Sequence, residues 1–242
     1  MVDPTRWFKS LPLQAQAVAR AASSAPPAKP NPSSSVVVPI RSIGPGQIDR
    51  IENHLLELDA HDRYLRFGYA ANDEQIRRYV AQLNFERDEL FGIFNRRLEL
   101  IAMAHLAFSI DPQYTSCAEF GVSVSKAARG RGYGSRLFER AVMHARNEGV
   151  QMLFIHALSE NTAMLRIARN AGAVIERDGS ESEAHLRLPP ADFDSRVTEM
   201  VNERVAITDY HLKAQARQFW GILAMLQDIR QGVREARERA RG

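Results

Sequence analysis

The segment 118–138 constrains the fold of this 242-residue chain more than any other part of it. Apolar and polar side chains alternate from residue 118 to residue 125, which predicts a half-buried strand. Three glycines follow at alternate positions between residues 130 and 134, and an amphipathic helix is expected from about Ser135. Glycine adopts positive φ angles at little cost, so the N–H groups of such a turn approach a ligand closely. Strand, glycine-rich turn and helix N-terminus together predict a phosphate site, beside which Arg129 and Arg131 are expected to add positive charge.

Three interpretations compete for the glycine-rich turn. A dinucleotide-binding fingerprint requires G-x-G-x-x-G, but here the third glycine comes one position early. A P-loop requires a Lys-Ser or Lys-Thr pair after its last glycine, and the chain has neither there. What remains is the pattern Arg129-x-x-Gly132-x-Gly134, and a plain surface turn between a strand and a helix also stays open.

That pattern resembles the [QR]-x-x-G-x-[GA] signature of the GNAT family of N-acetyltransferases. In this family the loop holds the pyrophosphate of acetyl-CoA. The family also places an asparagine after the second parallel strand and a glycine about eleven residues later, which match Asn161 and Gly172. The segments 63–67 and 161–165 look most like the bacterial branch that acetylates protein lysines.

The order of expected elements agrees with that resemblance. Periodicity predicts seven strands, near residues 35–41, 90–94, 98–110, 118–125, 150–158, 173–177 and 183–188. Helices are expected at 47–58, 73–83 and 135–148, and the segment 159–164 leads into a last helix that ends near Gly172. The resemblance implies an α/β (α+β) class, the GNAT acyl-CoA N-acyltransferase fold, with a mixed seven-stranded sheet flanked by helices.

Composition divides the chain into three parts. Seven of the eleven prolines precede residue 40, so residues 1–34 are expected to form a flexible N-terminal arm. Residues 35–190 form the predicted N-acetyltransferase domain. Residues 191–242 are predicted to be a C-terminal helical extension, because apolar residues recur at helical spacing between 212 and 233. That stripe packs either on the chain's own domain or in a homodimer.

Charge and cysteine content exclude several classes of protein. The 32 basic and 29 acidic residues leave a net charge of +3, which is too small for a nucleic-acid-binding signature. The single cysteine, Cys117, excludes an internal disulfide and a multi-cysteine metal site, and no metal is expected. The sequence has no apolar run long enough for a membrane span and no secretory h-region, so a cytoplasmic protein is expected.

The resemblance implies where acetyl-CoA, the co-substrate, would bind. The two parallel strands would separate at their C-terminal ends, and the pantetheine arm would pair there with the backbone of Val122, Ser123 and Val124. Asn161 would hydrogen-bond the amide portion of the cofactor. The pyrophosphate would bind the N–H groups of the turn, which comprises Arg129, Gly130, Arg131, Gly132, Tyr133, Gly134 and Ser135.

An amine is mostly protonated near pH 7, so acetyl transfer needs a base. Glu119 is the candidate, because it lies on the polar face of the strand and related acetyltransferases often use a glutamate there. An exposed or salt-bridged strand glutamate is the alternative. His105 and Cys117 are interpreted as packed or hydrogen-bonded residues.

Many members of the family carry a tyrosine seven residues after the motif asparagine, where it protonates the departing thiolate. This chain has Ala168 at that position, so the role falls to Ser159, Tyr133 or water. The sequence predicts acetyl transfer to an amine, with a protein lysine first and a small amine second. The alternative function is a non-catalytic module that binds acyl-CoA and acts through its terminal helices.

Overall fold

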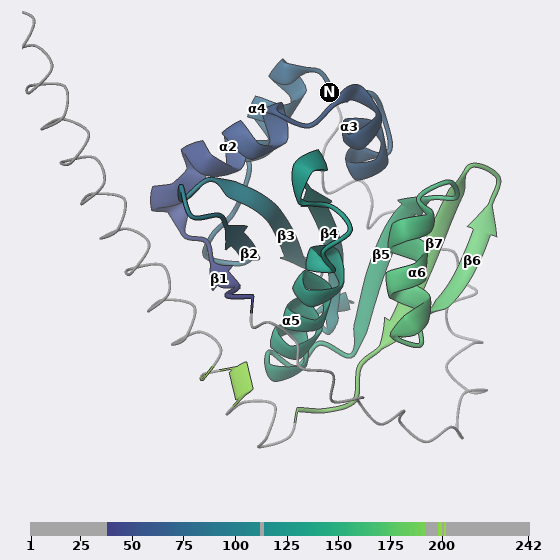
Figure 1. Cartoon of the computed structure of the whole chain (residues 1–242). Helices are drawn as coiled ribbons and strands as arrows, with labels where there is room; N and C mark the ends of the chain where they lie inside the picture. Colours follow the sequence, from purple (N-terminus) through teal and green to yellow (C-terminus); the bar gives the residue numbers. More distant parts are fainter. Residues whose placement is uncertain (1–37, 112–113, 192–197, 200, 202–242) are drawn as a thin grey trace, which may run out of the picture.

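The computed structural model describes residues 38–111, 114–191, 198–199 and 201 (Figure 1). Their centre is a mixed seven-stranded sheet with the strand order β1-β2-β3-β4-β5-β7-β6. β4 and β5 are its one parallel pair, and the other neighbours are antiparallel. The strands are β1 (Arg41–Ser42), β2 (Glu89–Phe94), β3 (Leu100–Phe108), β4 (Cys117–Val124), β5 (Met152–Leu158), β6 (Val174–Asp178) and β7 (Glu181–Arg187). The predicted seven-stranded α/β fold is confirmed.

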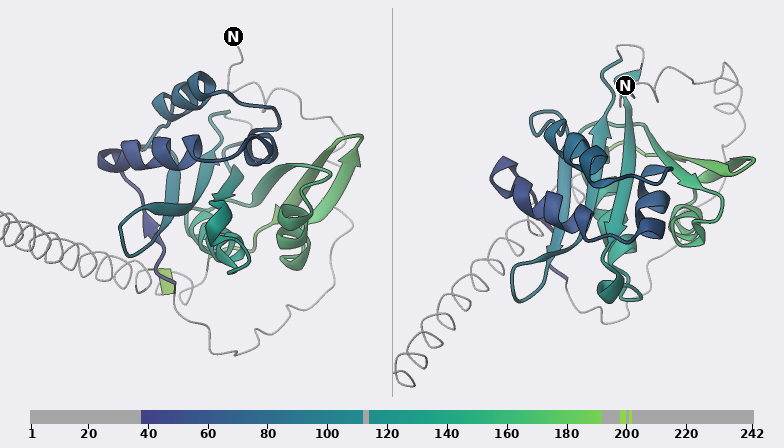
Figure 2. Two further views of the ribbon diagram at one scale, coloured as in Figure 1. Left: turned by 45° about the horizontal axis from the view of Figure 1, so that its top comes forward. Right: turned by 90° about the horizontal axis from the view of Figure 1, so that it is seen from above.

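Helices cover both faces of the sheet, as Figure 2 shows. One face carries α2 (Ile48–Leu56), α3 (Ala60–Phe67) and α4 (Asp73–Ala81), and the other carries α5 (Tyr133–Asn147) and α6 (Thr162–Asn170). Successive strand residues point to opposite faces, so the sheet supports two separate cores. The larger core packs Phe120 of β4 edge-on against Phe138 of α5, with ring centroids 5.0 Å apart. The smaller core packs α2 and α4 on β2 and β3.

The structure corrects three of the predicted elements. The first strand is only Arg41–Ser42, shorter than the expected 35–41. The charged segment after residue 59 is a separate helix, α3, whose N-cap Asp59 accepts the N–H of Asp62 at 2.9 Å. α5 begins at Tyr133 rather than Ser135, because Gly132 takes the N-cap position with φ +74°. The arm 1–34, the apolar stripe at 212–233 and any homodimer contact lie outside the described residues.

A short piece of the predicted extension, near residue 199, contacts the sheet's α5 helix. Glu199 accepts hydrogen bonds from Arg140 at 2.5 Å and from His144 at 2.6 Å, and Asn147 donates to its second oxygen. Burial opposes the charge of Glu199, but these donors and the Arg140 charge lower its pKa to about 2. This ion pair ties the chain after the last strand to the helix that joins β4 to β5. Within the described residues no helix is long and apolar enough to cross a membrane.

A buried histidine holds the far end of β4. His54 of α2 lies 3.0 Å from the Leu100 carbonyl through Nδ1 and 2.8 Å from the Ser123 hydroxyl through Nε2. The ring is 2% exposed, and this burial lowers the pKa of His54 to about 4. A neutral imidazole with Nδ1–H donating to the carbonyl and Nε2 accepting from the hydroxyl satisfies both contacts.

This histidine predicts a pH dependence of stability. Between pH 6.5 and pH 4 His54 is protonated in the unfolded chain but stays neutral in the folded protein. The free energy of unfolding therefore falls as the pH falls. We expect a loss on the order of 3 kcal/mol across this window. Urea unfolding of His54→Gln should show a flatter pH dependence there, whereas His61→Gln, at an exposed position, should keep the wild-type slope. Equal slopes in all three proteins would contradict this assignment.

Candidate active site

The candidate site begins where β4 and β5 stop pairing. Their parallel register joins Cys117 to Met152, Ala118 to Leu153 and Glu119 to Phe154, and no later pair exists. β4 nevertheless continues to Val124 and β5 to Leu158. The expected parallel pair that separates at its C-terminal end is therefore present, and β4 has a free backbone edge beyond Glu119.

The register of β3 and β4 decides which backbone groups lie on that edge. Ser125 donates to Ile101 at 2.9 Å, and Ser109 donates to the carbonyl of Cys117 at 3.0 Å. Backbone groups of alternate residues point to the same side, so Ser123 also faces β3. Its side chain is bonded to His54. Ser123 therefore does not fit the role predicted from sequence, whereas the backbone groups of Val122 and Val124 face the gap.

The turn after β4 is open and supplies several N–H groups. Gly130 and Gly132 both have φ +74°, and nothing lies within 4 Å of the position where a Cβ would be added. Among the described residues, the N–H groups of residues 130–135 donate to no backbone carbonyl, and Arg136 is the first to do so, to Gly132 at 3.1 Å. Unpaired N–H groups at the start of a 15-residue helix attract anions. The turn is thus a concentration of free donors directly beside the gap.

Two residues of the turn differ from their predicted behaviour. Gly134 lies inside α5 without positive φ, and a Cβ there would come 3.2 Å from Ile167, so this glycine serves the approach of α5 to α6. Arg129 was expected to offer its charge to a phosphate. Instead its guanidinium forms an ion pair with Asp62 of α3, a residue 8% exposed. Arg131 is exposed and contacts only the carbonyl of Ala127 at 3.4 Å among the described residues.

Asn161 follows β5 at the opposite side of the gap. Its side-chain oxygen accepts the N–H of Met164 at 3.1 Å and so caps α6. Its amide nitrogen has no partner among the described residues and is available to a ligand. The expected position of Asn161, after the second parallel strand, agrees with the structure, but its role as the cap of α6 was not predicted.

Glu119 lies on the sheet face covered by α2, α3 and α4. Within the described part of the chain it has no ion pair or hydrogen bond, which disfavours the salt-bridged alternative there. Its side chain shares this face with Gly121 and, across the β3–β4 register, with His105. The negative charge of Glu119 contributes to a raised pKa of Tyr79, after the larger effect of burial. A partly buried carboxylate next to the gap is therefore available to accept a proton.

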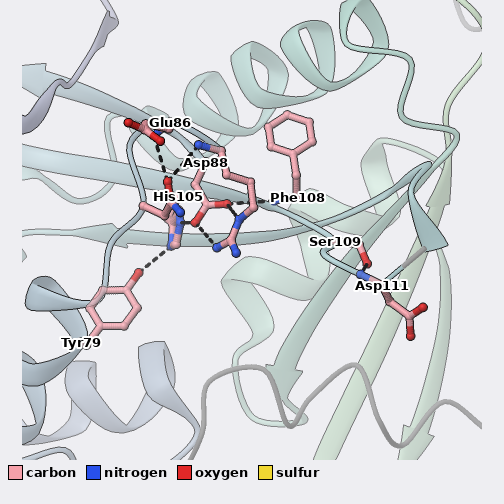
Figure 3. A network of polar contacts seen from close by, with 9 residues as sticks. Tyr79, Glu86, Asp88, His105, Phe108, Ser109 and Asp111 are labelled. Atoms are coloured by element: carbon pink, nitrogen blue, oxygen red, sulfur yellow. Dashed lines mark hydrogen bonds and ion pairs between the residues drawn. The ribbon is translucent and has the colours of Figure 1, made fainter. Parts of the chain in front are cut away.

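A chain of polar side chains crosses the same face, and Figure 3 shows its centre. Tyr79 of α4 lies 2.7 Å from His105 Nδ1, and His105 Nε2 lies 3.2 Å from Asp88. Arg87 donates two hydrogen bonds to Asp88, at 2.6 and 2.7 Å. Burial raises the pKa of Asp88, but the bonds from Arg87 and His105 outweigh it and lower the pKa to about 2. His105 is hydrogen-bonded, in agreement with the expectation of a packed or hydrogen-bonded residue, but its network with Tyr79 and Asp88 was not predicted.

The structure narrows the candidates for protonating a thiolate. Ala168 of α6 is fully buried in the core, and the Ser159 hydroxyl is bonded to Gly179 of the β6–β7 turn and to Glu181 and Ser182 of β7. Cys117 is buried, which raises the pKa of its thiol, so it is a packed residue as expected. Of the three candidates from the sequence, Tyr133 and water remain as sources of a proton for the departing thiolate. The described residues contain no cluster of three or more potential metal ligands.

The chain is similar to known acetyltransferases. The model of the acetyltransferase (GNAT) family matches residues 53–173, which is half of the chain. The chain is 24% identical over 166 residues to Acetyltransferase Pat of Mycolicibacterium smegmatis, an alignment that covers 68% of this chain. The chain spans only 50% of that relative's length. The GNAT domain of S. lividans PAT has the same fold, with a TM-score of 0.53 and 19% identity over 62% of this chain and 89% of that one.

The buried carboxylate of the polar chain gives a stability prediction. Asp88→Asn removes the charge that Arg87 and His105 share in a site where Asp88 is 5% exposed, so we expect a loss of about 2–4 kcal/mol in the free energy of unfolding. The matched control is Asp73→Asn, which breaks the exposed ion pair with Arg63 and should cost less than about 1 kcal/mol. Urea denaturation at pH 7 measures both, and a control variant as unstable as Asp88→Asn would contradict this ranking.

Proposed function

The chain belongs to the acetyltransferase (GNAT) family, and from this membership we propose that it transfers the acetyl group of acetyl-CoA to an amine. One observation carries the proposal most directly. The parallel pair β4–β5 opens after Glu119, and the open edge leads to a turn in which the N–H groups of residues 130–135 have no backbone carbonyl partners in the described chain. An extended thioester and its diphosphate need these two features in this order.

The residues on this edge fit acetyl-CoA. The backbone groups of Val122 and Val124 face the gap and would pair with the amides of the pantetheine arm. The N–H groups of residues 130–135 would hold the pyrophosphate, and the amide nitrogen of Asn161 would reach the arm from the β5 side. A diphosphate would also compete with Asp62 for Arg129. When bound there, acetyl-CoA supplies an activated thioester, so the protein needs to contribute mainly position and charge.

Glu119 would act as the base. Its carboxylate has no partner among the described residues, and it lies at the point where the gap begins. An ammonium brought to this face would form an ion pair with Glu119 and then give up its proton to it, directly or through a water. The N–H groups on the gap edge of β4 would stabilise negative charge on the reacting carbonyl oxygen.

A protein lysine is our first choice of acceptor. The relative from M. smegmatis is named Acetyltransferase Pat, and the segments 63–67 and 161–165 resemble the branch that modifies lysines in proteins. A small amine is the second choice. A cytoplasmic protein of bacterial origin fits this proposal, since acetyl-CoA and the protein acceptors occur there.

One observation favours a second function. Many relatives carry at position 168 a tyrosine that protonates the departing thiolate, and in this chain the residue is a fully buried alanine. A non-catalytic module that binds acyl-CoA and acts through its terminal helices would need no such group. Acetyl-CoA turnover with purified proteins separates the two functions, since the module would bind CoA without transferring acetyl.

Replacement of the base tests the catalytic part. We expect Glu119→Gln to lower kcat by about 10²–10⁴-fold, because the amide accepts no proton, while calorimetry gives an unchanged affinity for CoA. Glu176→Gln is the matched control, since Glu176 is an exposed strand glutamate of β6. Acetylation of a lysine-containing peptide panel measures the rates, and wild-type turnover by Glu119→Gln would exclude Glu119 as the base.

Replacement of a glycine tests the phosphate site. Gly132→Glu adds a side chain and a negative charge among the N–H groups of the turn, so we expect CoA affinity to fall at least about tenfold. Gly179→Glu is the control, because Gly179 also has positive φ and open space but lies in the β6–β7 turn. Calorimetry with CoA measures both variants, and equal affinities would place the phosphate site elsewhere.

A further inference from the structure

The positively charged guanidinium of Arg66 packs against the middle of β4, where β4 and β5 begin to separate. The Arg66 guanidinium lies so close to Gly121 that a Cβ on this glycine would come within 2.7 Å of Nη1 and 2.8 Å of Cζ. A glycine inside a strand often marks the close approach of another group. Here that group is a guanidinium, two residues beyond Glu119 and on the same face.

A series of hydrogen-bonded side chains holds the Arg66 guanidinium in place. Arg66 donates to the Tyr79 hydroxyl at 3.0 Å, and Tyr79 in turn contacts His105, which contacts Asp88. The donors and acceptors agree in one direction: Arg66 N–H to Tyr79, Tyr79 O–H to His105 Nδ1, and His105 Nε2–H to Asp88. The Tyr79 hydroxyl thus accepts a hydrogen bond from Arg66 and donates one to His105, and in this way it positions Arg66.

The guanidinium has more donors than partners. Its single hydrogen bond within the described residues goes to Tyr79, and Nε is buried without an acceptor. Glu119 lies on the same face of the sheet, but no ion pair joins Glu119 to Arg66 within the described residues. A charge kept in place but left unneutralised is available to an oxygen of a bound molecule.

We propose that Arg66 places a fixed positive charge beside the reacting carbonyl, where it stabilises negative charge on the carbonyl oxygen. Tyr79, His105 and Asp88 are the residues that position it. The inference rests on the proposed function, because it needs the thioester to lie at the point where β4 leaves β5. A guanidinium with fixed direction, held in a partly buried place, acts more strongly on such an oxygen than it would in water.

Binding measurements test the inference without turnover. S-Carboxymethyl-CoA carries a carboxylate one bond beyond the position of the acetyl-CoA carbonyl, and S-acetonyl-CoA, with a ketone at the same place as that carboxylate, is the neutral analogue of similar shape. We expect the affinity ratio of the charged to the neutral analogue to fall about tenfold in Arg66→Gln relative to wild type. Arg66→Lys should keep most of the ratio, and the exposed control Arg78→Gln should keep all of it. Calorimetry at pH 7.5 measures each pair.

Gly121→Ala provides a variant that retains the charge. The added methyl group forces the guanidinium from its place, so the ratio should fall as in Arg66→Gln while the net charge is unchanged. Affinity for CoA itself reports that each variant is folded and has an intact phosphate site. An unchanged ratio in both Arg66→Gln and Gly121→Ala overturns the inference. Failure of the wild-type protein to bind CoA would overturn the proposed function instead, and this inference with it.

Discussion

The arrangement of the molecule depends on two parallel strands that pair for three residues and then separate. β3 holds β4 along its whole length on one side, and β7 holds β5 on the other, so neither strand can turn back to close the gap. The aromatic contact of Phe120 with Phe138 fixes α5 against β4, and the turn between them is therefore fixed beside the gap as well. An open sheet edge is normally a liability in a folded protein. Under the proposed function, the pantetheine arm of acetyl-CoA would supply the missing partner.

Local patterns in the sequence predicted much of this arrangement. Alternation placed Phe120 in the core and Glu119 on the opposite face, and the structure agrees. Glycine chemistry predicted the positive φ of Gly132, and the helix expected at 135–148 ends at Asn147, just before Gly149 with φ +82°. These features depend on a residue and its near neighbours, and short-range rules suffice for them. Helix α3 was missed because its charged and aromatic residues do not form a simple apolar stripe.

Contacts between distant parts of the chain were beyond such rules. Tyr79 and His105 are separated by 26 positions, and His54 and Ser123 by 69, so no spacing in the sequence signals that they meet. Arg129 was expected to face a phosphate, but its partner is Asp62 from another helix. One signal was present and unused. Gly121 interrupts an otherwise regular strand, and a glycine inside a strand often marks the close approach of another group.

Helix α3 joins the two halves of the proposed site. Asp62, in its first turn, contacts Arg129 of the turn, and Arg66, one helical turn later, rests on β4 at the start of the gap. Lys126 and Asp59, 3.7 Å apart, add a weaker exposed contact between the same two elements. Because a helix of this length moves as a unit, a change in the Arg129–Asp62 pair also bears on the place of Arg66. One short element, α3, thus supplies Arg66 and pairs with the side chain of Arg129, and it packs on both β4 and β5.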